Sequence, residues 1–125
     1  AGTQFVSGLD NGLGAVTLAL GASADGLQRI ADVPIHFADP LVRRAKALQA
    51  THDAAIPQAR MNAATAAPVG AVAGGSVRVR QGQGEAILTV AVDENVPNAC
   101  VRVSAAHAAT AALGDMCGTI NVERA

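Results

Sequence analysis

The sequence predicts one small domain built mainly of β-structure, with short helices between strands that close into a barrel. Six or so short strand-like runs are separated by turn residues along the 125 residues, a length that supports a single core. A parallel α/β sheet needs a helix between successive strands, and the tight reversal at 82–84 leaves no room for one. Closure into a barrel leaves few strand edges open, so we expect a barrel in preference to a doubly wound sheet.

Composition excludes several classes of function. Half of the residues are hydrophobic but only two are aromatic, both Phe, so the core must consist of Val, Leu, Ile and Ala and offers almost nothing for base stacking. The net charge is −1 and the arginines are scattered, which argues against a nucleic-acid partner. No apolar run is long enough to cross a bilayer, and the start lacks the layout of a secretory signal, so we expect a soluble domain without membrane insertion.

The predicted organisation is a Gly/Ala-rich lead-in over residues 1–30 followed by the barrel domain over residues 31–125. The lead-in contains one candidate edge strand, Ala15–Leu20, between two glycines. Its abrupt beginning suggests a piece of a longer polypeptide, in which the lead-in would be a tether.

The first elements of the barrel domain are predicted from Pro and capping residues. Val33–Phe37 is an apolar segment whose Pro places it at a strand start or a sheet edge. A helix should follow, because Asp39 is a good N-cap, Pro40 suits the first helical position, and apolar residues recur at helical spacing at Leu41, Ala45 and Leu48. A loop over 51–57 then leads into a strand at 58–61.

The stretch from Ala59 to Arg80 is the most informative part of the chain. Asn62 can accept a hydrogen bond from a free N–H of a short Ala-rich helix, and Gly70 can close that helix in the left-handed conformation. Pro68 should shorten the helix, because Pro lacks an N–H. The strand at 76–80 should place its valines on one face and its arginines on the other.

The remaining elements follow from alternation and turn chemistry. The reversal at 82–84 returns the chain as a strand, Glu85–Val92, with Ala86, Leu88, Val90 and Val92 on one face. Further strands are expected at 100–103 and 119–122. An alanine-rich helix is expected at Ala105–Leu113, closed by Gly114.

No complete catalytic, cofactor or metal site is recognisable, so we assign no catalytic, cofactor-binding or metal-binding residue. Gly12-Leu13-Gly14 begins like a dinucleotide fingerprint, but Thr17 stands at the third glycine position. Two cysteines and three isolated histidines satisfy neither a zinc site nor an iron–sulfur cluster; they are Cys100, Cys117, His36, His52 and His107.

Three arrangements have both a functional and a structural interpretation, and we favour the structural one in each. His52-Asp53 could be a base and its carboxylate, but neighbouring residues point apart, which favours a loop pair. His107 is expected to cap or pack instead of binding a ligand. Three arginines could bind an anion together, although a solvated face or a subunit contact is favoured; they are Arg78, Arg80 and Arg102.

The two cysteines are expected to be semi-buried thiols, reduced in a cytosolic setting. A bridge between Cys100 and Cys117 stays the alternative in an oxidising compartment.

Three segments carry a family resemblance: ADVPIHFADPLVRRAKALQ from Ala31, ARMNAATAAPVGAVAGGSVRVRQGQGEA from Ala59, and VPNACVRVSAAHAATAALG from Val96. Between Ile35 and Gly114 the chain resembles the C-terminal domain of the large iron–sulfur subunit of bacterial NADH:quinone oxidoreductase, respiratory complex I. The second segment is also similar to the molybdopterin-dinucleotide-binding domains of molybdenum oxidoreductases.

The resemblance implies a double-psi β-barrel, of the aspartate decarboxylase-like and molybdopterin-dinucleotide-binding-like type. It implies a non-catalytic structural domain whose parent complex transfers electrons from NADH to quinone. The iron–sulfur clusters would belong to an N-terminal part of the parent subunit, so this fragment is expected to hold no cofactor. Its partners would be the other domains and subunits of complex I, at the cytoplasmic side of the bacterial inner membrane. The family pattern gives no role for Cys117.

Other functions remain open at this point. The chain could be the cofactor-binding C-terminal domain of a molybdopterin-dependent oxidoreductase, or a peptide-binding barrel module like the N-terminal domains of some ATPases. Barrels of this kind also include a decarboxylase that cleaves its own Gly-Ser bond. Gly75-Ser76 is such a dipeptide, but here it opens a strand, which disfavours self-cleavage.

Overall fold

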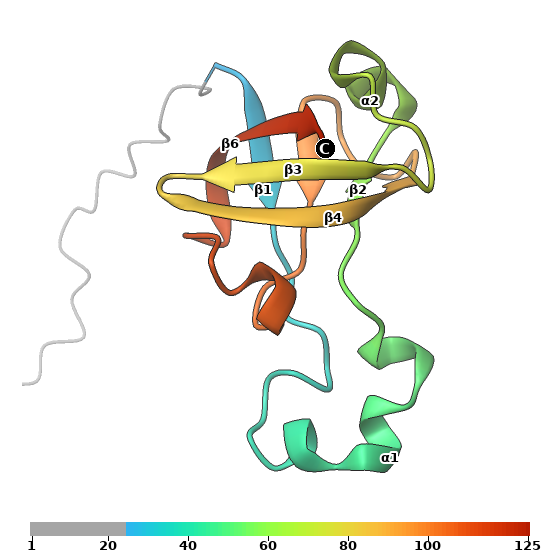
Figure 1. Ribbon diagram of the computed structural model, residues 1–125, viewed down its shortest axis with the longest axis vertical. Coiled ribbons are helices and arrows are strands. Elements are labelled where there is room, and N and C mark those ends of the chain that lie inside the picture. Colours follow the sequence, from blue (N-terminus) through green and yellow to red (C-terminus); the bar gives the residue numbers. More distant parts are fainter. Residues whose placement is uncertain (1–24) are drawn as a thin grey trace, which may run out of the picture.

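The computed structural model describes residues 25–125, and within them six strands close into a barrel (Figure 1). Two expected features, the strand Ala15–Leu20 and the glycine pair Gly12 and Gly14, lie outside the described residues. The strands are β1 (Leu27–Ile30), β2 (Ala59–Met61), β3 (Ser76–Gln81), β4 (Gly84–Val92), β5 (Cys100–Arg102) and β6 (Cys117–Arg124). Strand β1 belongs to the barrel, which therefore begins before residue 31, the predicted boundary.

Strand order around the barrel is β1-β5-β2-β4-β3-β6. The pairs β1–β5 and β2–β4 are parallel and the other four are antiparallel. Exchanging β1, β2 and β3 for β4, β5 and β6 reproduces the same set of pairs, so the two halves are related by a pseudo-two-fold axis and each inserts a strand into the other. This is the double-psi β-barrel, and the predicted fold class is confirmed.

The register shows where the pseudo-two-fold axis crosses the barrel wall. Arg60 of β2 lies opposite Arg102 of β5, and these two residues are equivalent under the exchange of halves. On the other side Val79 of β3 lies opposite Val122 of β6. The arginines are exposed and the valines buried, so the axis leaves the barrel wall between two outward-facing cations.

Most of the barrel core consists of aliphatic side chains, as the composition predicts. Alternation along the strands buries Val77 and Val79 of β3 while Arg78 and Arg80 face outward. The rest of the core includes Met61, Leu88, Val90, Val101, Val103 and Ile120. Val92 is an exception to the predicted inner face of β4, because the end of that strand leaves the core and the residue is 45% exposed.

The capping predicted for the central helix is confirmed. Helix α2 (Ala63–Val69) begins at Asn62, whose side chain accepts a hydrogen bond of 2.8 Å from the N–H of Thr65. Gly70 ends it in the left-handed conformation, with φ of 68°. Pro68 lies in the last turn, and the helix still reaches Val69.

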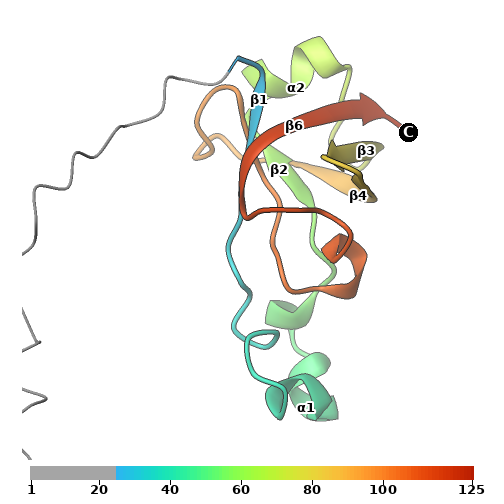
Figure 2. The ribbon, with the colours of Figure 1, turned by 90° about the vertical axis from the view of Figure 1, so that its left-hand side faces the viewer.

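The segment between β1 and β2, residues 31–58, differs from prediction, and we call it the arm. It extends away from the barrel along the long axis of the molecule in two views (Figures 1 and 2). Val33–Phe37 is not a strand, because Val33 and Pro34 have no regular structure and residues 35–37 form a turn. In place of one helix there are a 3₁₀ turn, η1 (Val42–Arg44), and a short helix, α1 (Lys46–Gln49).

The expected arm helix is interrupted at Ala45, whose ψ of 98° is extended. Asp39 does act as a local cap, because its carboxylate accepts hydrogen bonds from the N–H groups of Leu41 and Val42. Leu41 is nevertheless 76% exposed. The apolar stripe finds no surface to pack against, and packing is the main source of helix stability in proteins.

The predicted helix at Ala105–Leu113 is also wrong. Only one 3₁₀ turn forms there, η3 (Ala108–Thr110). Ala106 has a φ of 61° and His107 is extended, so neither residue is helical and no helix can run through them. Alanine content favours helix only weakly, and tertiary contacts of this loop override it.

Candidate functional site

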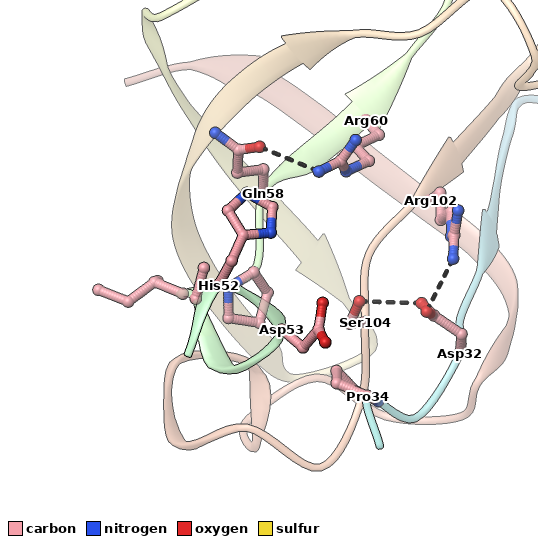
Figure 3. Close-up of a pocket in the computed structure, with 11 residues that line it drawn as sticks. Asp32, Pro34, His52, Asp53, Gln58, Arg60, Arg102 and Ser104 are labelled. Atoms are coloured by element: carbon pink, nitrogen blue, oxygen red, sulfur yellow. Dashed lines mark hydrogen bonds and ion pairs between the residues drawn. The ribbon is translucent and has the colours of Figure 1, made fainter. Parts of the chain in front are cut away.

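A polar cleft of about 470 Å³ lies where the arm joins the barrel (Figure 3). One wall comes from the ends of β1, β2 and β5, and the other from η2 (His52–Ala54) and the chain leading into β2. Its polar side chains are Asp32, His52, Asp53, Gln58, Arg60, Arg102 and Ser104. Ile56 and Pro57 add an apolar side.

The shortest hydrogen bonds in the cleft are those of Asp32. Its carboxylate accepts a hydrogen bond of 2.8 Å from Nη2 of Arg102 and one of 2.9 Å from Oγ of Ser104. The hydrogen bond from Arg102 is the largest cause of a lowered pKa at Asp32, and the same bond raises the pKa of Arg102. Asp32 thereby joins one ion pair and one hydrogen bond on the barrel side of the cleft.

The other side of the cleft is more loosely held. Nη2 of Arg60 donates a hydrogen bond of 3.4 Å to Gln58. Asp53 directs its carboxylate into the cleft toward Ser104 (Figure 3). Within residues 25–125 no hydrogen bond links the His52 imidazole to the Asp53 carboxylate, and both residues sit on the 3₁₀ turn η2. The geometry of a base held by its carboxylate is therefore not formed.

The charges of the cleft balance. Two guanidinium groups, Arg60 and Arg102, face two carboxylates, Asp32 and Asp53. A cleft with no excess of either sign does not concentrate a polyanion by its field. The arrangement suits hydrogen bonding and structural ion pairing between the arm and the barrel. In the described part of the chain no three His, Cys, Asp or Glu side chains lie grouped as a metal site would need.

Of the three arginines that could have bound an anion together, Arg102 is separated from Arg78 and Arg80. Nε of Arg80 lies 3.2 Å from the Glu85 carboxylate, and Arg78 lies 4.0 Å from the same group. Arg80 also approaches Glu123 on β6, at 3.8 Å. Arg102 is on β5, and strands β2 and β4 lie between β5 and β3. The structural interpretation, a solvated outer face, fits this arrangement.

The histidine and cysteine predictions have different outcomes. Nδ1 of His107 accepts a hydrogen bond of 3.0 Å from the N–H of Ala109, and its ring meets Phe37 edge-on at 4.9 Å between centroids. The capping and packing role of His107 is therefore confirmed. Both cysteines are free thiols, and Cys117 is exposed instead of semi-buried. They pair with β1 from opposite sides, Cys100 through β5 and Cys117 through β6.

Arg29 is a residue that sequence reasoning did not single out, and it is buried inside the barrel at 2% exposure. Its guanidinium donates to the Gln81 side chain and to three backbone carbonyls, those of Val103, Gly114 and Asp115. Burial lowers its pKa, opposed by the nearby Cys117. The four-residue strand β1 gives no pattern from which an inward arginine could be predicted.

No protein-family description and no curated protein matches this chain. Among solved structures the chain is similar to the rationally designed mkDPBB_sym_86 protein, with 23% sequence identity and a TM-score of 0.48. The similarity covers 82% of this chain and 98% of the designed one. None of the helices in residues 25–125 has the length and apolar character required to span a bilayer.

Proposed function

We propose that this chain is the C-terminal, non-catalytic structural domain of the large iron–sulfur subunit of a bacterial NADH:quinone oxidoreductase. Support comes from how the segments that carry the resemblance fold. The segment from Ala59 to Ala86 forms β2, α2, β3 and the start of β4 as one continuous unit with its cap at Asn62. The segment from Ala31 forms most of the arm, and that from Val96 forms β5 and the loop after it.

The observation that carries the proposal is the internal neutralisation of the cleft. Arg102 is held by Asp32, and Asp32 also accepts from Ser104, so the polar groups on the barrel side of the cleft are bound to each other. A site for a cofactor presents donors that its ligand completes, whereas these contacts hold the arm to β5. In the proposed function the domain contributes fold and assembly. Electron transfer and the iron–sulfur clusters belong to the parent subunit, at the cytoplasmic face of the inner membrane.

The test is co-purification from the cell that makes the protein. An affinity tag added to the gene product that contains this chain allows it to be isolated from membranes solubilised in mild detergent. We expect it to bring down NADH-oxidising activity, flavin and iron in fixed ratio. A tagged chain that elutes alone, without NADH oxidation, contradicts the proposal.

One observation favours a second candidate, the cofactor-binding domain of a molybdopterin-dependent oxidoreductase. Arg60 lines the cleft and makes only one hydrogen bond, of 3.4 Å, among the described residues, so its other donors are available to a ligand. Titration with GDP, as a probe for the dinucleotide tail, separates the two functions. Saturable binding that Arg60→Met abolishes and Arg78→Met preserves would favour the second candidate, and no binding favours the structural domain.

A further inference from the structure

The arm is much longer than its counterpart in the other half of the barrel. Under the exchange of the two halves, residues 31–58 correspond to the short connection 93–99 between β4 and β5. The shorter connection joins equivalent strands in the same barrel. The helical turns of the arm contain no buried residue. The arm therefore adds little to the core, and its sequence must be explained in another way.

The apolar side chains of the arm are exposed to an unusual degree. Of the ten large hydrophobic residues that are exposed in residues 25–125, five lie on the arm: Val33, Ile35, Leu41, Leu48 and Ile56. Ile35 and Leu41 are the extreme cases, at 72% and 76% exposure. Exposed apolar residues gathered on one element mark an interaction surface more often than single ones do.

The same part of the arm is basic. Arg43, Arg44 and Lys46 lie between Leu41 and Leu48 in the chain. None of these three cations forms an ion pair within the described residues. The carboxylate of Asp39 is used within the turn, where it accepts from backbone N–H groups. We call the set Ile35, Leu41, Arg43, Arg44, Lys46 and Leu48 the apolar–basic face.

The arm holds this face in a defined shape. The side-chain amide of Gln49 donates to the carbonyls of His36 and Val42, at 3.1 and 3.2 Å, which ties the two ends of the turn region together. Phe37 packs edge-on against His107 and connects the arm to the loop before β6. A surface held by such contacts loses less conformational entropy when it binds.

We propose that the apolar–basic face docks onto a neighbouring protein surface that is apolar and rimmed by acidic residues. The proposal rests on the proposed function in one respect, because it places that surface in another domain or subunit of the parent complex. The cations of this face have no ion-pair partner in residues 25–125, and they lie beside exposed leucines. A surface that binds the face must therefore supply both acidic groups and apolar contact. A membrane surface is a poorer match. Amphipathic helices that lie on membranes extend over many turns, whereas the helix here is four residues long and is separated from η1 at Ala45.

Site-specific crosslinking in the producing cell is the first test. A photo-reactive amino acid at position 41 is expected to form a covalent adduct with another protein, and the double variant R43E/R44E should reduce that adduct at least tenfold. The matched control is position 87, because Ile87 is also a large exposed apolar residue, at 59%, but lies on β4. An adduct at position 41 that is no stronger than at position 87 overturns the proposal.

Co-purification gives the second test. Leu41→Asp and R43E/R44E should each lower recovery of NADH-oxidising activity with the tagged chain at least tenfold, whereas Ile87→Asp should leave it unchanged. Thermal unfolding confirms that the variants fold, which we expect because the substituted residues are exposed. If the wild-type chain brings down no such activity, the proposed function fails, and the crosslink at position 41 still decides the docking face.

Two other results would overturn the proposal, because each would identify a different binding partner for the apolar–basic face. Binding of the wild-type chain to vesicles of phosphatidylglycerol, lost in R43E/R44E, would identify a membrane surface. A dimer in light scattering that Leu41→Asp dissociates would identify a second copy of this chain. We expect a monomer in light scattering and no binding to these vesicles.

Discussion

The guanidinium of Arg29 donates a hydrogen bond of 2.9 Å to the side-chain oxygen of Gln81 in the barrel interior. Arg29 is on β1 and Gln81 ends β3, and both strands pair with β6. Further donors of the guanidinium reach the carbonyls of Val103, Gly114 and Asp115. The hydrogen-bond partners of this buried cation are a side-chain amide oxygen and backbone carbonyls. None of these partners is a carboxylate. One side chain thereby joins β1, β3 and the chain on both sides of η3.

Arg29→Ala should destabilise the protein strongly. The substitution leaves the Gln81 side-chain oxygen and the Val103 carbonyl, two buried acceptors, without a donor, and each such group costs about 1–3 kcal/mol. We expect a loss of at least about 3 kcal/mol in the free energy of unfolding, measured from urea unfolding with an unchanged slope. The control is Arg124→Ala, because Arg124 is exposed and should change stability by about 0.5 kcal/mol or less. Similar losses for the two variants would show that the Arg29 contacts do not stabilise the barrel.

Gly84 should not tolerate any side chain. It begins β4, and a Cβ built on it overlaps the carbonyl oxygen of Ala112. Because that oxygen is backbone, the loop before β6 would have to move, and Gly84→Ala should cost about 3 kcal/mol or more. Gly114→Ala is the matched control, since a Cβ there only reaches ordinary contact with Gln81 at 3.9 Å. Circular dichroism and urea unfolding compare the two variants, and equal stability contradicts this packing.

The barrel could be predicted largely because its signals are local. The alternation in Ser76–Gln81, the reversal before Gly84 and the cap at Asn62 each depend on a few neighbouring residues, and each forms as expected. Strand alternation determines which residues face the core, so the aliphatic interior follows from composition and period together.

The arm and the cleft could not be predicted because they depend on tertiary placement. The spacing of Leu41, Ala45 and Leu48 is helical, yet no barrel surface is available to cover it, and the helix breaks. The pairing of Asp32 with Arg102 joins residues 70 positions apart through the register of β1 and β5. The spacing of residues along the sequence does not predict that register.

Substitution of Asn62 by Ala and by Asp should each destabilise the protein, for different reasons. Its side-chain oxygen caps α2, while its Nδ2 donates to the Val96 carbonyl at 3.0 Å and to the Asn98 side chain at 2.6 Å. Asn62→Ala loses the cap and both donated bonds, and should cost about 2–3 kcal/mol in urea unfolding.

Asn62→Asp separates the two roles of that side chain. The variant keeps an acceptor for the cap but turns a carboxylate oxygen toward two other oxygens. It should be less stable than wild type at pH 7 and recover part of the difference near about pH 4, where a protonated carboxyl can donate. A deficit that does not change between these pH values would show that the donated bonds contribute little.

The ion pair of Asp32 with Arg102 should make a small contribution to stability that depends on pH. The pKa of Asp32 is lowered, first by the hydrogen bond from Arg102 and further by the one from Ser104. A carboxyl whose pKa is lowered by folding binds fewer protons than in the unfolded chain, so it stabilises the protein above the unfolded pKa of about 3.9 and loses that effect as the pH falls through the folded value.

Both side chains are more than two-fifths exposed, at 47% and 41%, so we expect less than about 1 kcal/mol. The difference in unfolding free energy between wild type and Asp32→Asn should therefore be present at pH 7, shrink in high salt, and vanish near about pH 2. A difference that persists unchanged at low pH would assign it to the hydrogen bond with Ser104 or to packing, and not to the charge.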